Sequence, residues 1–177
     1  MAIRIPIWDP NQELIVKYEG LMDMDGLYKR IHTWFINRKF EPVEKVFKDK
    51  SRQEGREEQI KIDGFRNDDP QFRVWVNVYI HTWNMNKVEV VVDGKKKMME
   101  KGRFKITIRA DFEVDYENRW ERSKFTRALL NFYIKYLIYR KLTVYGDKIE
   151  YEGHKLQELI KGYLGMGAAG DQYADMW

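Results

Sequence analysis

The chain lacks most of the residues that enzymes use for covalent or metal chemistry. Its 177 residues include no cysteine, which excludes disulfide bonds, thiol catalysis and cysteine-bound metal. Ser51 and Ser123 are the two serines, and neither lies in the strand–turn–helix context of a nucleophilic serine. His32, His81 and His154 lack the close spacing of zinc ligands. We therefore expect no metal, no cofactor and a non-enzymatic function.

Long apolar runs and phosphate-binding motifs are also missing. Gly165, Gly167 and Gly170 follow no predicted strand, so they do not form a phosphate-binding loop. No run approaches the roughly 18 apolar residues of a membrane span, and no basic-then-apolar leader opens the chain. The net charge of +4 comes from 32 basic and 28 acidic residues, which is a weak indication of nucleic-acid binding. We expect a cytoplasmic protein.

Two stretches of strict alternation dominate what is present. In residues 71–83 and 103–116 every second side chain is apolar, which is typical of strands with one buried face. Between them, residues 87–99 contain several valines and the turn dipeptide Asp93-Gly94, a strong hairpin signal. We predict an antiparallel meander of three or four strands over residues 71–116.

The phase of this meander predicts an irregularity. A two-residue turn at 93–94 would place Val88 opposite Met99 and odd-numbered residues of the returning strand on the buried side. From Phe104 onward the apolar residues are even-numbered. The phase must therefore shift by one residue before Phe104, and Gly102 is the predicted site of a β-bulge.

The remaining patterns complete an α+β fold with a sheet of about six or seven strands. Helical spacing predicts an N-terminal helix and two C-terminal helices, the first of which is apolar nearly all round. The predicted helices span 24–39, 124–141 and 153–164. The other predicted strands span 3–7, 14–18, 43–48 and 59–63. We also predict a charged loop or hairpin tip over 49–56, a turn over 67–70 and a small hairpin over 144–152. We expect one domain over 1–164 and a flexible tail over 165–177.

The odd-numbered face of the first long strand carries an unusual set of side chains. A strand with one buried face does not normally place two tryptophans and a tyrosine on the other. Basic residues of the returning strand point the same way. The candidate binding residues on this face are Arg73, Trp75, Tyr79, Trp83, Arg103, Lys105 and Arg109, and Trp177 joins them from the tip of the tail.

Two interpretations of this face remain open. Aromatic rings interleaved with basic groups are typical of platforms for single-stranded nucleic acid. Alternatively, a helix, the tail or another subunit covers the face, since Trp, Tyr and Arg are enriched in protein contacts. Nearby, Asp111, Glu113 and Asp115 form a cation site or an acid/base pair only with help from another strand, so we interpret them as a solvated acidic strand end.

These patterns favour an interaction or assembly protein that self-associates or docks a protein partner through the aromatic strand face, the apolar helix and the tail. Binding of single-stranded nucleic acid is the first alternative. The order of elements is loosely similar to that of helix-grip domains, which hold an apolar ligand between sheet and helix, so an apolar-ligand carrier is the second alternative.

Overall fold

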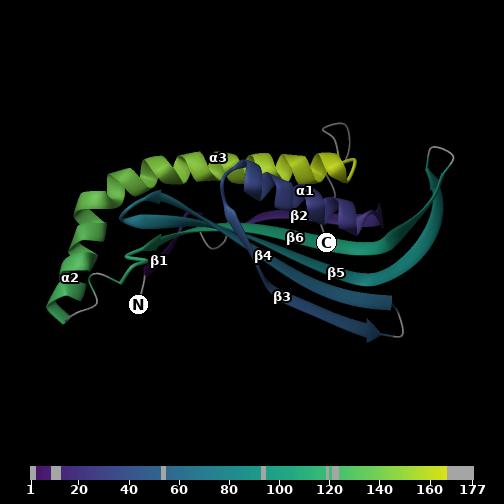
Figure 1. Cartoon of the computed structure of the whole chain (residues 1–177), viewed down its shortest axis with the longest axis horizontal. Helices are drawn as coiled ribbons and strands as arrows, with labels where there is room; N and C mark the ends of the chain where they lie inside the picture. The colour runs from purple at the N-terminus through teal and green to yellow at the C-terminus, as the bar shows by residue number, and fades with distance from the viewer. Residues whose placement is uncertain are drawn as a thin grey trace.

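The protein is an α+β structure in which helices cover one face of an antiparallel sheet (Figure 1). The computed structural model describes residues 3–8, 13–52, 55–92, 95–118, 120 and 124–166, without the side chains of 44–52, 92, 95, 124 and 127. The elements in chain order are β1 Ile3–Pro6, β2 Leu14–Met22, α1 Met24–Asn37, β3 Glu41–Arg52, β4 Gly55–Asp69, β5 Phe72–Val92, β6 Lys95–Val114, α2 Lys124–Phe132, the π-helix η1 Tyr133–Ile138 and α3 Tyr139–Tyr163.

The sheet has six strands in the order β1-β6-β5-β4-β3, and β2 also pairs with β6. β1 and β2 therefore share one edge of β6, with Ile3 opposite Val114 and Leu14 opposite Ile108. Six strands agree with the predicted number. The predicted turn at 67–70 lies slightly later, at Pro70 and Gln71, because β4 continues through Asp69. β3 and β4 likewise extend from both sides into the predicted loop at 49–56.

Helix α1 confirms the N-terminal helix predicted from the spacing. Its N-cap is Asp23, whose side chain accepts a hydrogen bond of 3.0 Å from the Gly26 amide. Leu27, Ile31 and Phe35 are fully buried against the sheet. The i, i+4, i+8 spacing of these three residues places them on one side of the helix.

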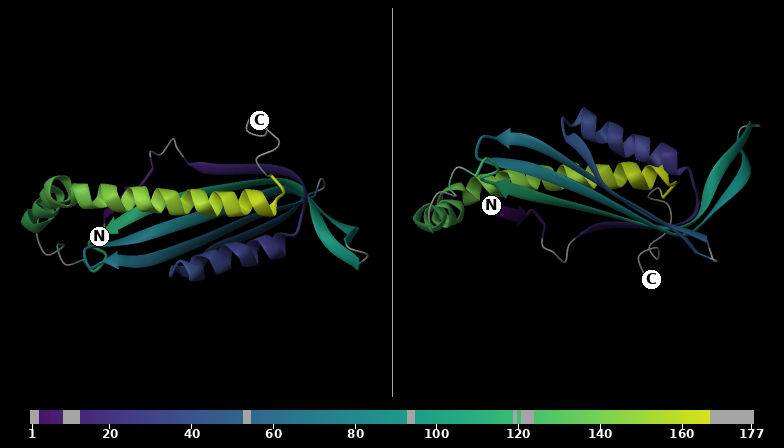
Figure 2. Two further views of the ribbon diagram at one scale, coloured as in Figure 1. Left: turned by 90° about the horizontal axis from the view of Figure 1, so that it is seen from above. Right: turned by 60° about the horizontal axis from the view of Figure 1, so that its bottom comes forward.

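The covered face of the sheet holds the core of the domain. α1 and α3 lie on the same side of the sheet (Figure 1) and run along it in the view from above (Figure 2). The even-numbered residues of β5 and β6 point to this side, as the alternation predicted. Fully buried members of the core include Phe72, Val74, Val76, Val78, Ile80, Ile106, Ile108, Ile149, Leu156 and Ile160.

The phase shift predicted near Gly102 exists, but its extra residue lies in the partner strand. Trp83 pairs with Arg103 whereas Asn86 pairs with Lys101, so Asn84 and Met85 together oppose Gly102. Asn84 takes the left-handed conformation, with φ of 55°. The pairing of β6 with β2 is regular through Gly102. The prediction that places the bulge at Gly102 was therefore wrong, because the extra residue lies in β5, where Asn84 adopts the left-handed conformation.

Gly102 is nevertheless required by close packing. A Cβ atom there would lie 2.6 Å from the Met85 sulfur and 2.8 Å from the Trp83 carbonyl oxygen, closer than real contacts allow. The bulge also shifts the pairing of β5 with β4, between Arg56 and Glu58. The irregularity thus crosses three neighbouring strands, and bulges increase local twist and bending.

Beyond the bulge and the end of β2, which pairs with β6 as far as Glu100, β5 and β6 continue as a two-stranded arm, residues 88–99 (Figure 2). The predicted meander of three or four strands is therefore two long strands, since the run starting at Val88 continues β5. The predicted register is confirmed, with Val88 opposite Met99 and Val92 opposite Lys95. The turn dipeptide itself lies outside the described residues.

The predicted hairpin over 144–152 was wrong, because α3 is helical throughout this stretch. Its buried positions follow helical spacing through Leu142, Ile149, Leu156 and Ile160. Gly153 lets the helix approach Trp8 so closely that a Cβ atom would lie 2.7 Å from the indole ring. Tertiary packing on this side therefore overrides the turn signal that the glycines gave.

The C-terminal helices form one run with a π-helical segment inside it. Leu130, Ile138 and Leu142 are buried although the first two are eight residues apart, a spacing that drifts around a regular α-helix. The wider turns of η1 absorb this drift and keep the buried positions on one side. At η1 the axis bends, so that α2 turns away from α3 at one end of the sheet (Figure 1). Among the described residues, no helix combines the length and apolarity that crossing a membrane requires.

Candidate interaction surfaces

The open face of the sheet is the side opposite α1 and α3, and it carries most of the side chains that the sequence singled out. The register places Trp75, Tyr79 and Trp83 on this face of β5. On β6, Lys105 lies opposite His81 and Arg103 lies opposite Trp83. No helix of the described part of the chain lies on it (Figure 1). The structure thus brings the predicted aromatic and basic residues together on one surface.

Trp75 is largely covered by neighbouring side chains on that surface. The Arg4 guanidinium lies 4.5 Å from the ring centroid of Trp75, and Phe65 packs against the indole at 5.2 Å between centroids. The indole N–H donates to Glu113 at 2.5 Å. Trp75 is 7% exposed, so little of its ring is available for stacking on a base.

Arg73 is held in the same cluster. Its guanidinium lies 4.5 Å from the ring centroids of both Phe65 and Tyr116. Its Nε donates to the Asn67 side chain at 2.8 Å, and Glu113 lies 3.8 Å from its Nη1. Arg73 therefore ties together the ends of three strands and a turn, which is a structural role.

The part of the open face nearer the bulge is more accessible. Tyr79, His81 and Trp83 are half-buried, and the imidazole stacks 3.8 Å from the indole. His81 Nε2 lies 2.9 Å from a Glu57 carboxylate oxygen. Burial raises the pKa of Tyr79, and the nearby Glu57 carboxylate adds to this effect. This end of the face keeps aromatic surface next to the exposed Arg103.

The last two candidate residues do not join this end. Arg109 is exposed and forms an ion pair with Glu13 at the start of β2. Trp177 lies outside the described residues, as does nearly all of the predicted tail. The helix before the tail ends at Tyr163, and the amide of Met166 donates back to the Lys161 carbonyl at 2.9 Å.

The acidic residues at the end of β6 are not a solvated strand end, so that interpretation was wrong. Asp111 is half-buried and accepts a hydrogen bond of 3.1 Å from Asn77, while Glu113 binds Trp75. Asp115 is buried and accepts from the Trp120 amide at 3.2 Å. Burial raises the pKa of Asp111, although Arg4 and Asn77 partly oppose this. No set of three or more metal-ligating side chains occurs among the described residues.

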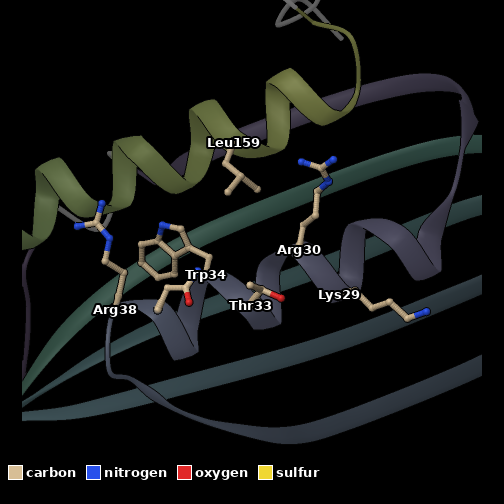
Figure 3. Close-up of a pocket in the computed structure, with 7 residues that line it drawn as sticks. Lys29, Arg30, Thr33, Trp34, Arg38 and Leu159 are labelled. Atoms are coloured by element: carbon tan, nitrogen blue, oxygen red, sulfur yellow. The ribbon is translucent and has the colours of Figure 1, made fainter.

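A groove of about 360 Å³ lies between α1 and α3 (Figure 3). The groove lies between two helices, whereas the apolar-ligand alternative places its cavity between sheet and helix, so the groove does not favour that alternative. Two of the cations are already engaged, since Arg38 lies 3.5 Å from Glu152 and Arg30 sits 5.0 Å above the Tyr163 ring. The lining residues are Lys29, Arg30, Thr33, Trp34, Asn37, Arg38 and Leu159.

The largest exposed apolar surface lies on α2 and η1. Five large side chains there are 42% to 76% exposed and follow one side of the helical run, with a spacing of four, three, four and one residues. Phe132 and Tyr136 touch, with ring centroids 4.8 Å apart. We call this surface the apolar stripe, and it consists of Phe125, Leu129, Phe132, Tyr136 and Leu137.

The opposite side of α2 and η1 anchors the helix to the domain. Leu130 and Ile138 are buried, and Tyr133 stacks on Trp120 at 5.7 Å between ring centroids. Thr126 donates a hydrogen bond of 2.8 Å to the Trp120 carbonyl. The sequence predicted a helix that is apolar nearly all round, and the structure shows one side covered and the other exposed.

No protein-family model, curated protein or solved structure matches the chain.

Proposed function

We propose that the protein is a non-enzymatic docking protein that attaches through the apolar stripe of α2 and η1. The observation that carries the proposal is the exposure of five large apolar side chains in one continuous line at the end of the domain. Contiguous apolar patches of this kind on a soluble domain mark interaction sites. The described part of the chain places nothing over the stripe.

The position of the stripe supports this role. α2 turns away from α3 and extends past the end of the sheet (Figure 1). The five side chains of the stripe are exposed at this end. Its backbone is held from behind by Leu130, Tyr133 and Ile138. An exposed surface on an anchored helix loses little conformational entropy on binding, which favours docking.

The absence of cysteine makes a direct test possible. Ala128→Cys, an exposed position on α2 beside the stripe, takes a spin label or an environment-sensitive dye. We expect its probe to become immobile and shielded from water when a docking surface is added or when the protein concentration is raised. Thr143→Cys, exposed on α3, is the matched control and should not change.

Three surfaces cover the candidate occupants in this test: the protein itself at rising concentration, phospholipid vesicles and an oligonucleotide. Shielding at Ala128→Cys but not at Thr143→Cys by any of them supports docking through the stripe. If the probe remains mobile and hydrated with all three, the proposal is wrong.

Single-stranded nucleic-acid binding on the open face is the second candidate function. It is favoured by the half-exposed Tyr79 and Trp83, because Arg103 lies opposite Trp83 and Lys105 lies opposite His81 between the two rings. Trp83→Ala should then weaken oligonucleotide binding by about 1–3 kcal/mol per stacked base. Trp75→Ala is the control. Because the Trp75 ring is covered, this variant should keep its affinity for the oligonucleotide. Equal oligonucleotide affinity of wild type and Trp83→Ala would exclude this candidate.

A further inference from the structure

The segment that carries the apolar stripe is one of two strongly basic segments of the chain. Residues 119–141 contain seven Lys and Arg residues and one acidic residue, Glu121. The whole chain contains 32 basic and 28 acidic residues, so the rest holds 25 basic and 27 acidic residues. Residues 95–109 carry the same net charge of +6, from seven Lys and Arg residues and Glu100. What distinguishes residues 119–141 is that the same short segment also carries five large apolar side chains that are exposed.

From this coincidence we infer that α2 and η1 dock onto the surface of an anionic phospholipid bilayer, with the apolar stripe in the interface. The inference rests on the proposed docking function and names its partner. A helix with an apolar face of Phe and Leu and with flanking Lys and Arg is the type that lies in the membrane interface. The basic residues are attracted to anionic headgroups while the apolar side chains leave water.

The arrangement of the charges fits this partner. Arg140 is exposed one helical turn beyond Tyr136, and the Lys135 ammonium lies 5.4 Å from the Tyr136 ring centroid. Aromatic side chains with cationic neighbours are favoured at the headgroup level. Lys141 is bound to Asp69 and so holds the helix to the domain.

The same charges disfavour the other occupants. Two copies that met stripe to stripe would bring two segments with a net charge of +6 together, and like charges at an interface oppose association. Nucleic acid would gain from the basic residues, but Leu129 and Leu137 offer neither a stacking surface nor a phosphate contact. An anionic bilayer offers a contact to both, because its headgroups attract the basic residues and its apolar interior accepts the aliphatic side chains.

Vesicle binding by the full chain tests the inference. Flotation with phosphatidylcholine vesicles containing about one third phosphatidylserine should show binding that is at least about tenfold tighter than binding to pure phosphatidylcholine. Raising the salt concentration should weaken it, since salt screens charge attraction. The double variant Phe125→Ser/Phe132→Ser should lose about tenfold or more of the affinity, because both side chains are exposed in the free protein and buried in the bilayer.

Matched variants on the arm and at its base control for nonspecific hydrophobic binding and for the loss of charge. Val91→Ser/Met98→Ser removes two exposed apolar side chains elsewhere and should keep the vesicle affinity within about twofold. Lys135→Gln/Arg140→Gln should weaken binding to the anionic vesicles about tenfold. Lys87→Gln/Lys101→Gln, the same charge change on exposed residues at the base of the arm, should have little effect.

The outcomes separate this inference from the proposed function. If the probe at Ala128→Cys is shielded by self-association or by an oligonucleotide and the anionic vesicles do not bind, docking stands and the lipid inference is overturned. If no surface shields the probe, both fail. Binding that is equal for neutral and anionic vesicles, or equal for the stripe and arm variants, also overturns the lipid inference.

Discussion

The C-terminal helical run has two parts, α3 and the preceding α2 with η1. The two parts differ in the side chains that they expose to solvent. α3 buries Ile149, Leu156 and Ile160 against the sheet and presents mostly polar and charged residues to solvent. α2 and η1 bury Leu130 and Ile138 but expose the apolar stripe as well. A helix that only completes a core needs a single apolar side. The second apolar side of α2 and η1 therefore points to a second partner.

The same substitution in the two parts gives the largest expected contrast. Leu156→Ala should lower the free energy of unfolding by about 2–5 kcal/mol, because it leaves a cavity under α3. Leu129→Ala, on the stripe, should change it by less than about 0.5 kcal/mol. Urea unfolding of both variants measures this. If Leu129→Ala also costs several kcal/mol, the stripe is packed against the domain and the contrast disappears.

Charge on α3 gives a second contrast of somewhat smaller expected size. Glu152 is buried and lies 3.3 Å from Arg66 and 3.5 Å from Arg38. Although burial opposes the charged form, Asp68 and Glu152 raise the pKa of Arg66, which therefore stays protonated. Glu152→Ala should lower the free energy of unfolding by about 3 kcal/mol, because it leaves the half-buried Arg66 cation with fewer partners. Glu150→Ala, exposed two residues earlier, should be nearly neutral, and thermal unfolding of both variants measures the difference.

The open face of the sheet is a third type of surface, not covered by a helix yet packed by its own side chains. Since the pKa of Asp111 is raised in the fold above its ordinary value of 3.8, the fold favours the protonated carboxyl. The resulting stabilisation is present at low pH and is lost as the pH rises through the raised pKa. Asp111→Asn keeps the group neutral and can still accept the hydrogen bond from Asn77.

We therefore expect Asp111→Asn to match the wild type in stability near pH 3 and to exceed it at pH 7, measured as the difference in the free energy of unfolding at each pH. Asp147→Asn, an exposed carboxylate on α3, should show no such growth with pH. A variant that is less stable than the wild type at pH 7 would mean that Arg4 and Arg109 stabilise the ionised carboxylate more than burial opposes it.

The fold was predictable from local patterns wherever one pattern acted alone. Alternation placed the buried faces of β5 and β6, and the Asp93-Gly94 signal gave the register of the arm. The bulge was predicted from a shift in the phase of the apolar alternation. Such a shift cannot show which of two paired strands holds the extra residue. The hairpin over 144–152 failed for a different reason, because the Gly146 signal carries no information about the buried helix that packs there.

The candidate sites were less predictable than the fold. The alternation placed Trp75 and Arg73 on the open face, but their cover comes from Arg4, Phe65 and Tyr116 on other segments. Spacing alone also could not show which side of the helix over 124–141 faces the sheet. The concentration of basic residues over 119–141 is, however, a sequence signal that could have indicated the docking surface before the structure.

The last and smallest effect concerns η1, which separates the two parts of the helical run. A π-helical segment amounts to one extra residue in an α-helix. Deleting Lys135, which is exposed in η1, would leave Leu130 and Ile138 seven residues apart, so that both face the sheet in a regular α-helix. We expect the stability to stay within about 1 kcal/mol of the wild type in urea unfolding and the stripe to remain exposed. Deleting the exposed Lys148 from the regular part of α3 is the control, because it rotates all later buried positions by about 100° and should destabilise the fold severely. If the two deletions lower the free energy of unfolding equally, η1 does not act as a single inserted residue.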